Sequence, residues 1–228
     1  MRAAVMIEFL LIAACFILVM VALGLWRVLR GPAAADRMMA AQLLGTGGIA
    51  AILGLEVDQV RAVCADAAAG QVLEAVNLNS PGQIVIAGQR EAVERGMALA
   101  KERGAKRAMM LPMSVPSHCA LMKPAAEKLA ARLSGVTFNA PVVPVIQNAD
   151  VSCFDEPDRI RQALVEQLFR PVRWIETVQH MAAAGVNTVV ECVPGKILTG
   201  LNKRIVAELN CLAITDSASL AAARQATD

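Results

Sequence analysis

The sequence has no tyrosine, only two histidines and just 3% aromatic residues. Proteins bind single-stranded nucleic acids largely by stacking bases on aromatic side chains, and they bind duplexes through a strongly basic face. The 228 residues carry a net charge of only +2, with lysine and arginine interspersed among aspartate and glutamate. We therefore expect no nucleic-acid partner.

Metal-binding patterns are also missing. The six cysteines show no Cys-x-x-Cys spacing, and His118 and His180 are the only histidines that could complete a zinc site. The sequence predicts no metal site. Because disulfide frameworks belong mainly to small secreted chains, we expect the cysteines to be reduced thiols.

Charged residues are scarce, at 18%, and hydrophobic residues reach 56%. No charge interrupts residues 9–26, which as a helix would be about 27 Å long, close to the thickness of the bilayer hydrocarbon core. This run predicts one transmembrane helix within a membrane segment at residues 1–42. A secretory signal peptide with a cleavage site at residues 33–35 is the alternative.

The charges that flank this run predict its orientation. Arg27, Arg30 and Arg37 follow the apolar residues, and positive charge collects on the cytoplasmic side of membrane helices. We expect an inner-membrane anchor with the C-terminal domain in the cytoplasm. If the N-terminal segment is an artefact, the protein would simply be cytoplasmic.

The same region has a motif of its own. Residues 25–32 read LWRVLRGP, and an Asp36-Arg37 pair and residues 42–46 (QLLGT) follow. Over residues 1–50 the chain resembles the small F-type subunit of multisubunit sodium/proton antiporters. The resemblance implies a membrane subunit.

A regular strand and helix pattern occupies residues 47–112. Apolar periodicity, glycine caps and turn residues predict the order βαββαβ, which is the split βαβ, ferredoxin-like arrangement. The expected strands are residues 48–55, 72–78, 83–87 and 106–111, and the expected helices are residues 58–69 and 90–103.

Residues 113–228 continue with helices and apolar strands. Helices are predicted at residues 124–133, 158–169, 173–184 and 198–209, and strands at residues 142–146 and 188–193. Apolar strands that alternate with helices favour part of an α/β layer with a parallel sheet.

Three motifs lead to a family. Residues 77–83 (NLNSPGQ), 104–107 (GAKR) and 112–122 (PMSVPSHCALM) together resemble the malonyl-CoA:acyl-carrier-protein transacylases of fatty-acid synthesis, over about residues 47–215. The resemblance implies a ferredoxin-like subdomain inserted into a hydrolase-like α/β acyltransferase domain. It also implies malonyl-CoA and acyl-carrier protein as partners and no cofactor.

The resemblance assigns roles to individual residues. His118 takes the position of the general base, the backbone carbonyl of Gln167 would orient its imidazole, and Asn79 matches an asparagine near the substrate cleft. An alternative for Asn79 is a turn between two strands. Cys119 is expected to lie on a strand and point away from His118, as a packing residue.

The family's serine nucleophile lies in a Gly-x-Ser-x-Gly turn, and the 228 residues contain no such motif. We therefore expect no nucleophile here and no acyl transfer by the chain alone. Three hypotheses remain: an acyltransferase that needs a second chain to supply the serine half, an antiporter-related membrane subunit with a passenger domain, and a chimeric gene.

Overall fold

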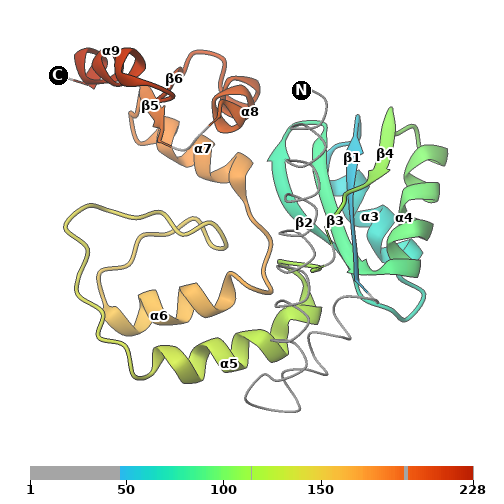
Figure 1. Cartoon of the computed structure of the whole chain (residues 1–228). Helices are drawn as coiled ribbons and strands as arrows, with labels where there is room; N and C mark the ends of the chain where they lie inside the picture. Colours follow the sequence, from blue (N-terminus) through green and yellow to red (C-terminus); the bar gives the residue numbers. More distant parts are fainter. Residues whose placement is uncertain (1–46, 114, 193–194, 228) are drawn as a thin grey trace, which may run out of the picture. The chain divides into compact units, whose positions relative to one another are not determined.

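The computed structural model describes residues 47–113, 115–192 and 195–227, which belong to one compact unit that begins at Gly47 (Figure 1). The expected membrane segment at residues 1–42 lies outside the described residues, as does nearly all of the antiporter-like stretch. Within the described ranges, no helix is both long and apolar enough to cross a membrane. The predicted division of the chain near residue 112 stays a prediction.

The first half of this unit is a four-stranded antiparallel sheet with the order β2-β3-β1-β4. Its chain order, βαββαβ, is the split βαβ arrangement expected from the sequence. The elements are β1 (Gly47–Leu53), α3 (Val57–Ala68), β2 (Leu73–Ser80), β3 (Gln83–Gln89), α4 (Arg90–Glu102) and β4 (Arg107–Met110).

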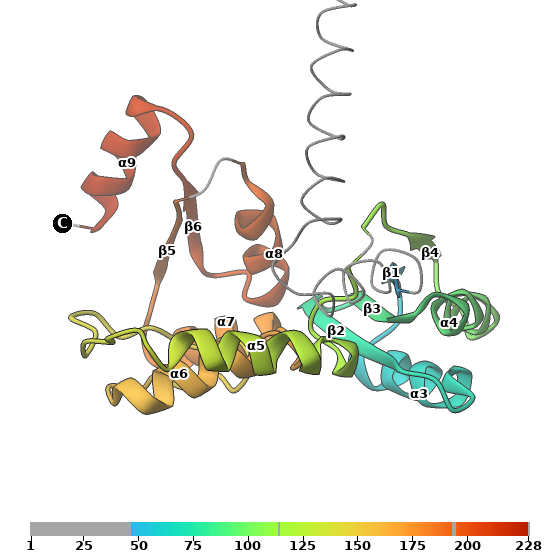
Figure 2. The ribbon, with the colours of Figure 1, turned by 60° about the horizontal axis from the view of Figure 1, so that its bottom comes forward.

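One face of the sheet is covered by α3 and α4, which lie side by side in Figure 2. Val60 and Val63 of α3 and Val93 of α4 pack on the inner side chains of the strands and are fully buried. Burial of apolar surface stabilises a fold by about 25 cal/mol per Å², so this cluster stabilises the sheet and its two helices. It makes the sheet a rigid support.

The opposite face of the sheet has a smaller apolar cluster, which includes Cys119. Ile49, Val76 and Val85 pack there against Cys119, whose exposed fraction is 0%. Since Cys119 directly follows His118, burial of this one side chain attaches the histidine segment to the back of the sheet.

The second half is mostly helical, with one small parallel sheet in which β5 pairs with β6. Neither β6 nor the Ala-rich helix α9 was predicted, because neither carries a clear apolar period. The elements are η1 (Ala120–Met122), α5 (Lys123–Leu133), α6 (Pro157–Glu166), α7 (Trp174–Ala183), β5 (Thr188–Glu191), α8 (Ile197–Ile205), β6 (Asn210–Ala213) and α9 (Ser217–Thr227).

The strand predicted at residues 142–146 is wrong. Only Ile146 makes a β-bridge, to Cys153, while the side chains of Val142 and Val143 are 100% and 68% exposed. An apolar run becomes a strand only where a neighbouring strand pairs with its backbone. No strand pairs with residues 142–145 in the part of the chain that the structure describes.

Glu191 at the end of β5 fixes the start of α8. Its carboxylate accepts hydrogen bonds from the backbone N–H groups of Leu198, at 3.1 Å, and Thr199, at 2.8 Å, and from the Thr199 hydroxyl. These N–H groups are among those that lack partners in the first turn of a helix. Desolvation raises the pKa of Glu191, but the hydrogen bonds from Thr199 and Leu198 outweigh it and hold the pKa below its usual value.

The lowered pKa predicts a pH dependence. The stability contributed by the Glu191 carboxylate should be complete above the unfolded-state pKa of about 4.3 and should be lost as the pH falls through the lower folded-state value. Glu191→Gln should lower protection of the β5 and α8 amides at neutral pH and remove this acid dependence. Hydrogen exchange between pH 3 and 7 would measure both, with the exposed Glu208→Gln as control. An unchanged acid profile in Glu191→Gln would refute the assignment.

Candidate active site

His118 lies in a turn that precedes η1, with its backbone in the left-handed region at φ 66°. A non-glycine residue in this region costs on the order of 1–3 kcal/mol and persists only when its surroundings fix it. Two contacts do so: the His118 N–H donates to the Leu168 carbonyl at 2.9 Å, and Nδ1 of the ring lies 2.7 Å from the Gln167 carbonyl oxygen. The end of α6 therefore holds both the backbone and the ring.

The ring contact determines the tautomer. A carbonyl oxygen can only accept a hydrogen bond, so Nδ1 must carry the proton that it donates to Gln167. In the neutral imidazole the lone pair then belongs to Nε2, which makes no hydrogen bond within the described residues. An imidazole held in this way presents a proton acceptor.

A second attachment joins the histidine segment to the sheet. The Ala120 N–H donates to Oε1 of Glu74, on β2, at 3.3 Å. Together with the burial of Cys119, this contact places the segment between β2 and the end of α6. Sequence reasoning missed Glu74 and the Leu168 carbonyl, because backbone acceptors and a lone glutamate on a strand leave no local signal.

Asn79 lies on β2, which continues to Ser80, and the turn is formed by Pro81 and Gly82. The alternative that placed Asn79 in the turn is therefore wrong. The strand register shifts between Leu78 and Ser80, so Asn79 is the extra residue of a β-bulge. Bulges redirect side chains and are common next to active sites. No side-chain hydrogen bond joins Asn79 to His118 or Gln167 in the described part of the chain.

The backbone after Gln167 nevertheless connects the histidine site to β2, the strand that carries Asn79. Five residues after Gln167, the Val172 N–H donates to the Val76 carbonyl at 2.8 Å, and the Val172 carbonyl accepts from the Leu78 N–H at 2.9 Å. This short parallel pairing covers the edge of β2 beside the bulge. The segment that orients His118 therefore also borders the strand that carries Asn79.

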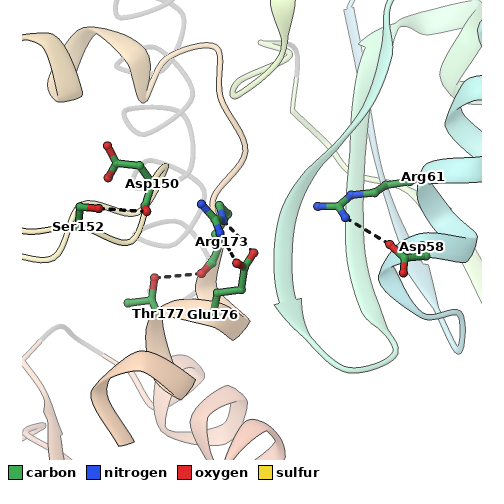
Figure 3. A network of polar contacts seen from close by, with 7 residues as sticks. All are labelled: Asp58, Arg61, Asp150, Ser152, Arg173, Glu176 and Thr177. Carbon is green, nitrogen blue, oxygen red and sulfur yellow. Dashed lines mark hydrogen bonds and ion pairs between the residues drawn. The ribbon is translucent and has the colours of Figure 1, made fainter. Parts of the chain in front are cut away.

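Arg173 fixes the end of this segment (Figure 3). Its guanidinium pairs with Glu176, in the first turn of α7, and its carbonyl accepts from the Thr177 hydroxyl at 2.9 Å. The hydrogen bonds that the Arg173 guanidinium donates to the Glu176 carboxylate raise the pKa of Arg173, and the same contact lowers the pKa of Glu176. The Arg173 N–H donates to the Asn148 carbonyl at 2.8 Å, so the loop at residues 147–152 is joined to the same point.

Cys119 does not form a catalytic pair with His118. The predicted strand at this position is wrong, because residues 117–118 form a turn. The Cys119 thiol donates to the Pro116 carbonyl at 3.1 Å. Burial, opposed by a backbone hydrogen bond at Leu121 and aided by the charge of Glu74, raises its pKa to about 11. The thiol is therefore protonated at neutral pH, and only a thiolate is a useful nucleophile.

A family model described as the acyl transferase domain matches residues 19–220 of this chain. The chain belongs to the acyl transferase domain family. This match begins at residue 19, well before the expected start of the resemblance at residue 47, and overlaps the apolar run at residues 9–26. The acyl transferase family therefore accounts for more of the chain than the three motifs predicted.

Individual acyl transferase relatives give the same result. The malonyl CoA-acyl carrier protein transacylase of Escherichia coli K12 is 57% identical over 179 residues, which cover 78% of this chain and 58% of the relative. The transacylase of Bacillus subtilis 168 is 42% identical and is covered over 57% of its length. The chain thus spans less than two thirds of the curated relatives that it matches.

Solved structures of acyl transferases match the fold. An acyl carrier protein S-malonyltransferase from Vibrio cholerae is 55% identical with a TM-score of 0.77, over 81% of this chain and 62% of that one. A malonyl-transacylase in complex with the acyl-carrier protein of a type II polyketide synthase is 47% identical with a TM-score of 0.79, over 84% of this chain and 63% of that one. The α/β fold is therefore that of the malonyl transferases.

Proposed function

We propose that this chain carries the general-base half of a site that transfers malonyl groups from coenzyme A to acyl-carrier protein. His118 is the base, the Gln167 carbonyl orients its ring, and Asn79 lies at the edge of the substrate cleft. The observation that carries the proposal is the 2.7 Å contact between Nδ1 of His118 and the Gln167 carbonyl, because it leaves Nε2 ready to accept a proton.

The proposed reaction has two steps. In the first, Nε2 of His118 removes the proton of a serine hydroxyl as its oxygen attacks the thioester carbonyl of malonyl-CoA, and the departing coenzyme A thiolate receives that proton. In the second, Nε2 removes the proton of the acyl-carrier protein's thiol, which attacks the malonyl ester, and the serine oxygen is reprotonated. Coenzyme A leaves before the second thiol reacts, as in ping-pong transfer.

The serine must come from elsewhere, because the 228 residues contain no Gly-x-Ser-x-Gly motif. The family resemblance puts this motif in the N-terminal half of the relatives. We therefore propose that the chain alone is inactive and that a polypeptide with the serine half completes the site.

An assay of malonyl transfer tests this function. The purified chain should show no transfer to acyl-carrier protein above background. Transfer should appear when the chain is mixed with an N-terminal fragment of the Escherichia coli relative that contains the serine motif. The fragment alone is the control. If a stable complex of the two forms without any transfer, or if the chain transfers malonyl by itself, the proposal is wrong.

The role of the N-terminal segment is a separate proposal. We propose that residues 9–26 anchor the chain in the inner membrane, since this run is uncharged and Arg27 and Arg30 follow it. Protease added to sealed inverted vesicles should then digest residues 56–228. A protected C-terminal domain would contradict the orientation, and full recovery in the soluble fraction would contradict the anchor.

The alternative function is that of an antiporter-related membrane subunit in which a chimeric gene has added a passenger domain. The acyl transferase match that begins at residue 19 favours the acyltransferase function instead. Reading genomic DNA across codons 40–60 from independent clones would show whether the two segments are joined in the organism.

A further inference from the structure

Two non-glycine residues in this region have left-handed backbones and are connected through the hydrogen bonds of Gln167 and Gln147. They are His118, at φ 66°, and Val151, at φ 58°. For a β-branched residue such as valine this conformation is a genuine outlier. Outliers of this kind cluster where a structure must hold a side chain in one place. The hydrogen bonds between the two residues connect the loop at residues 147–152 to His118, which indicates that this loop helps to hold the histidine in place.

Gln147 is the centre of this connection. Its side-chain oxygen Oε1 accepts a hydrogen bond from Nε2 of Gln167 at 2.8 Å, and its backbone carbonyl accepts from the Val151 N–H at 2.9 Å. Its own N–H donates to the Ser152 carbonyl at 2.9 Å, and its exposed fraction is 6%. The strained turn at Val151 thus folds back on Gln147 and fixes its backbone.

The fixed Gln147 side chain holds Gln167 by a hydrogen bond. Gln167 is the C-cap residue of α6, where backbone carbonyls lack partners within the helix and the last turn frays easily. Its N–H is held by the Ala163 carbonyl at 3.0 Å, while its own carbonyl points to His118. A side-chain hydrogen bond to a buried partner restricts rotation at this fraying end.

We propose that Gln147 is a positioning residue for His118: it holds Gln167 so that the Gln167 carbonyl keeps the proton on Nδ1 and leaves Nε2 free. The inference rests on the proposed role of His118 as general base, but its physical content is the tautomer of one imidazole. Gln147 does not contact the histidine and acts entirely through Gln167.

The tautomer can be measured directly in the full chain. With ¹⁵N-labelled histidine, long-range proton–nitrogen spectra distinguish Nδ1–H from Nε2–H, and His180→Gln assigns the His118 signals because the chain has only two histidines. In the starting protein, the neutral His118 ring should be almost entirely Nδ1–H. Gln147→Met, which keeps the volume and removes the acceptor, should lower the ratio of Nδ1–H to Nε2–H about fivefold, as partial loss of a neutral hydrogen bond would.

Two further variants make the test specific. Gln147→Glu keeps an oxygen acceptor for Gln167 and should retain the Nδ1–H tautomer. Gln162→Met changes an exposed glutamine on the same helix, which bonds to Glu166 and not to Gln167, and should also retain it. A tautomer ratio in folded Gln147→Met equal to that of the starting protein would overturn the proposal. So would an equal loss in Gln162→Met, because the effect would then be general loosening of α6.

The result is independent of the activity assay. If the tautomer depends on Gln147 but transfer in the complemented mixture does not depend on His118, the positioning stands and the proposed function falls. If transfer depends on His118 but the His118 tautomer ratio does not change when Gln147 is replaced, the proposed function stands and the positioning role of Gln147 is wrong.

Discussion

Replacing His118 by alanine is expected to lower malonyl transfer about 10²–10⁴-fold in the mixture of this chain with a serine-bearing fragment, which is the usual contribution of a positioned general base. The reason is the geometry at the end of α6, where Nδ1 is bound to the Gln167 carbonyl at 2.7 Å. Without the ring, neither the serine hydroxyl nor the carrier thiol has a group to accept its proton. Initial rates with malonyl-CoA and acyl-carrier protein measure the loss.

The chain supplies a matched control for this substitution. His180 is the other histidine and lies exposed on α7. His180→Gln should leave the rate unchanged, and both variants should bind the serine-bearing fragment as tightly as the starting protein. Transfer that survives His118→Ala, with binding intact, would show that another group performs the proton transfer. If only His118→Ala fails to bind the serine-bearing fragment, the histidine has a structural role in the contact between the two polypeptides.

The sequence predicts His118 and Gln167 through a motif and not through local physics. The two residues are far apart in the chain, and the contact that joins them uses a backbone carbonyl, which every residue has. Only the resemblance of residues 112–122 to a known family identifies the histidine, and only the fold brings the end of α6 to it. The strands and helices of Gly47–Met110 are easier to predict from the sequence, because their apolar periods and glycine turns are local signals.

The errors have a common physical cause. Asn79 reads as a turn residue because the sequence Asn-Ser-Pro-Gly is rich in turn formers, but pairing with β3 continues past it to Ser80. Residues 142–146 read as a strand because they are apolar, but no strand pairs with residues 142–145 in the described part of the chain. In both cases pairing with another strand decides the outcome, and neither turn-forming residues nor an apolar run shows whether that pairing occurs.

Hydrogen exchange should separate the two halves of the described unit on the order of 10³-fold in protection, because local opening costs far less than global unfolding. Amides of β1 and β3 are paired on both sides and cover a buried core, so they should exchange only by global unfolding. Amides of Thr188–Glu191 belong to a sheet of two four-residue strands. Parallel sheets are stable when further strands and helices cover them, and two strands alone are marginal.

Each part of the chain is stabilised by the apolar surface that it buries within the chain itself. The side chains of Val142, Val143 and Val145 are more than half exposed, so residues 142–146 should exchange as fast as β5. Adding the serine-bearing fragment should slow exchange in both segments and leave β1 and β3 unchanged. The full-length Escherichia coli relative is the reference for complete protection. Strong and equal protection of Ile84 to Ile86 and Thr188–Glu191 in the monomeric chain would show that the second half has closed a core of its own, and a partner would then have no strand to pair with there.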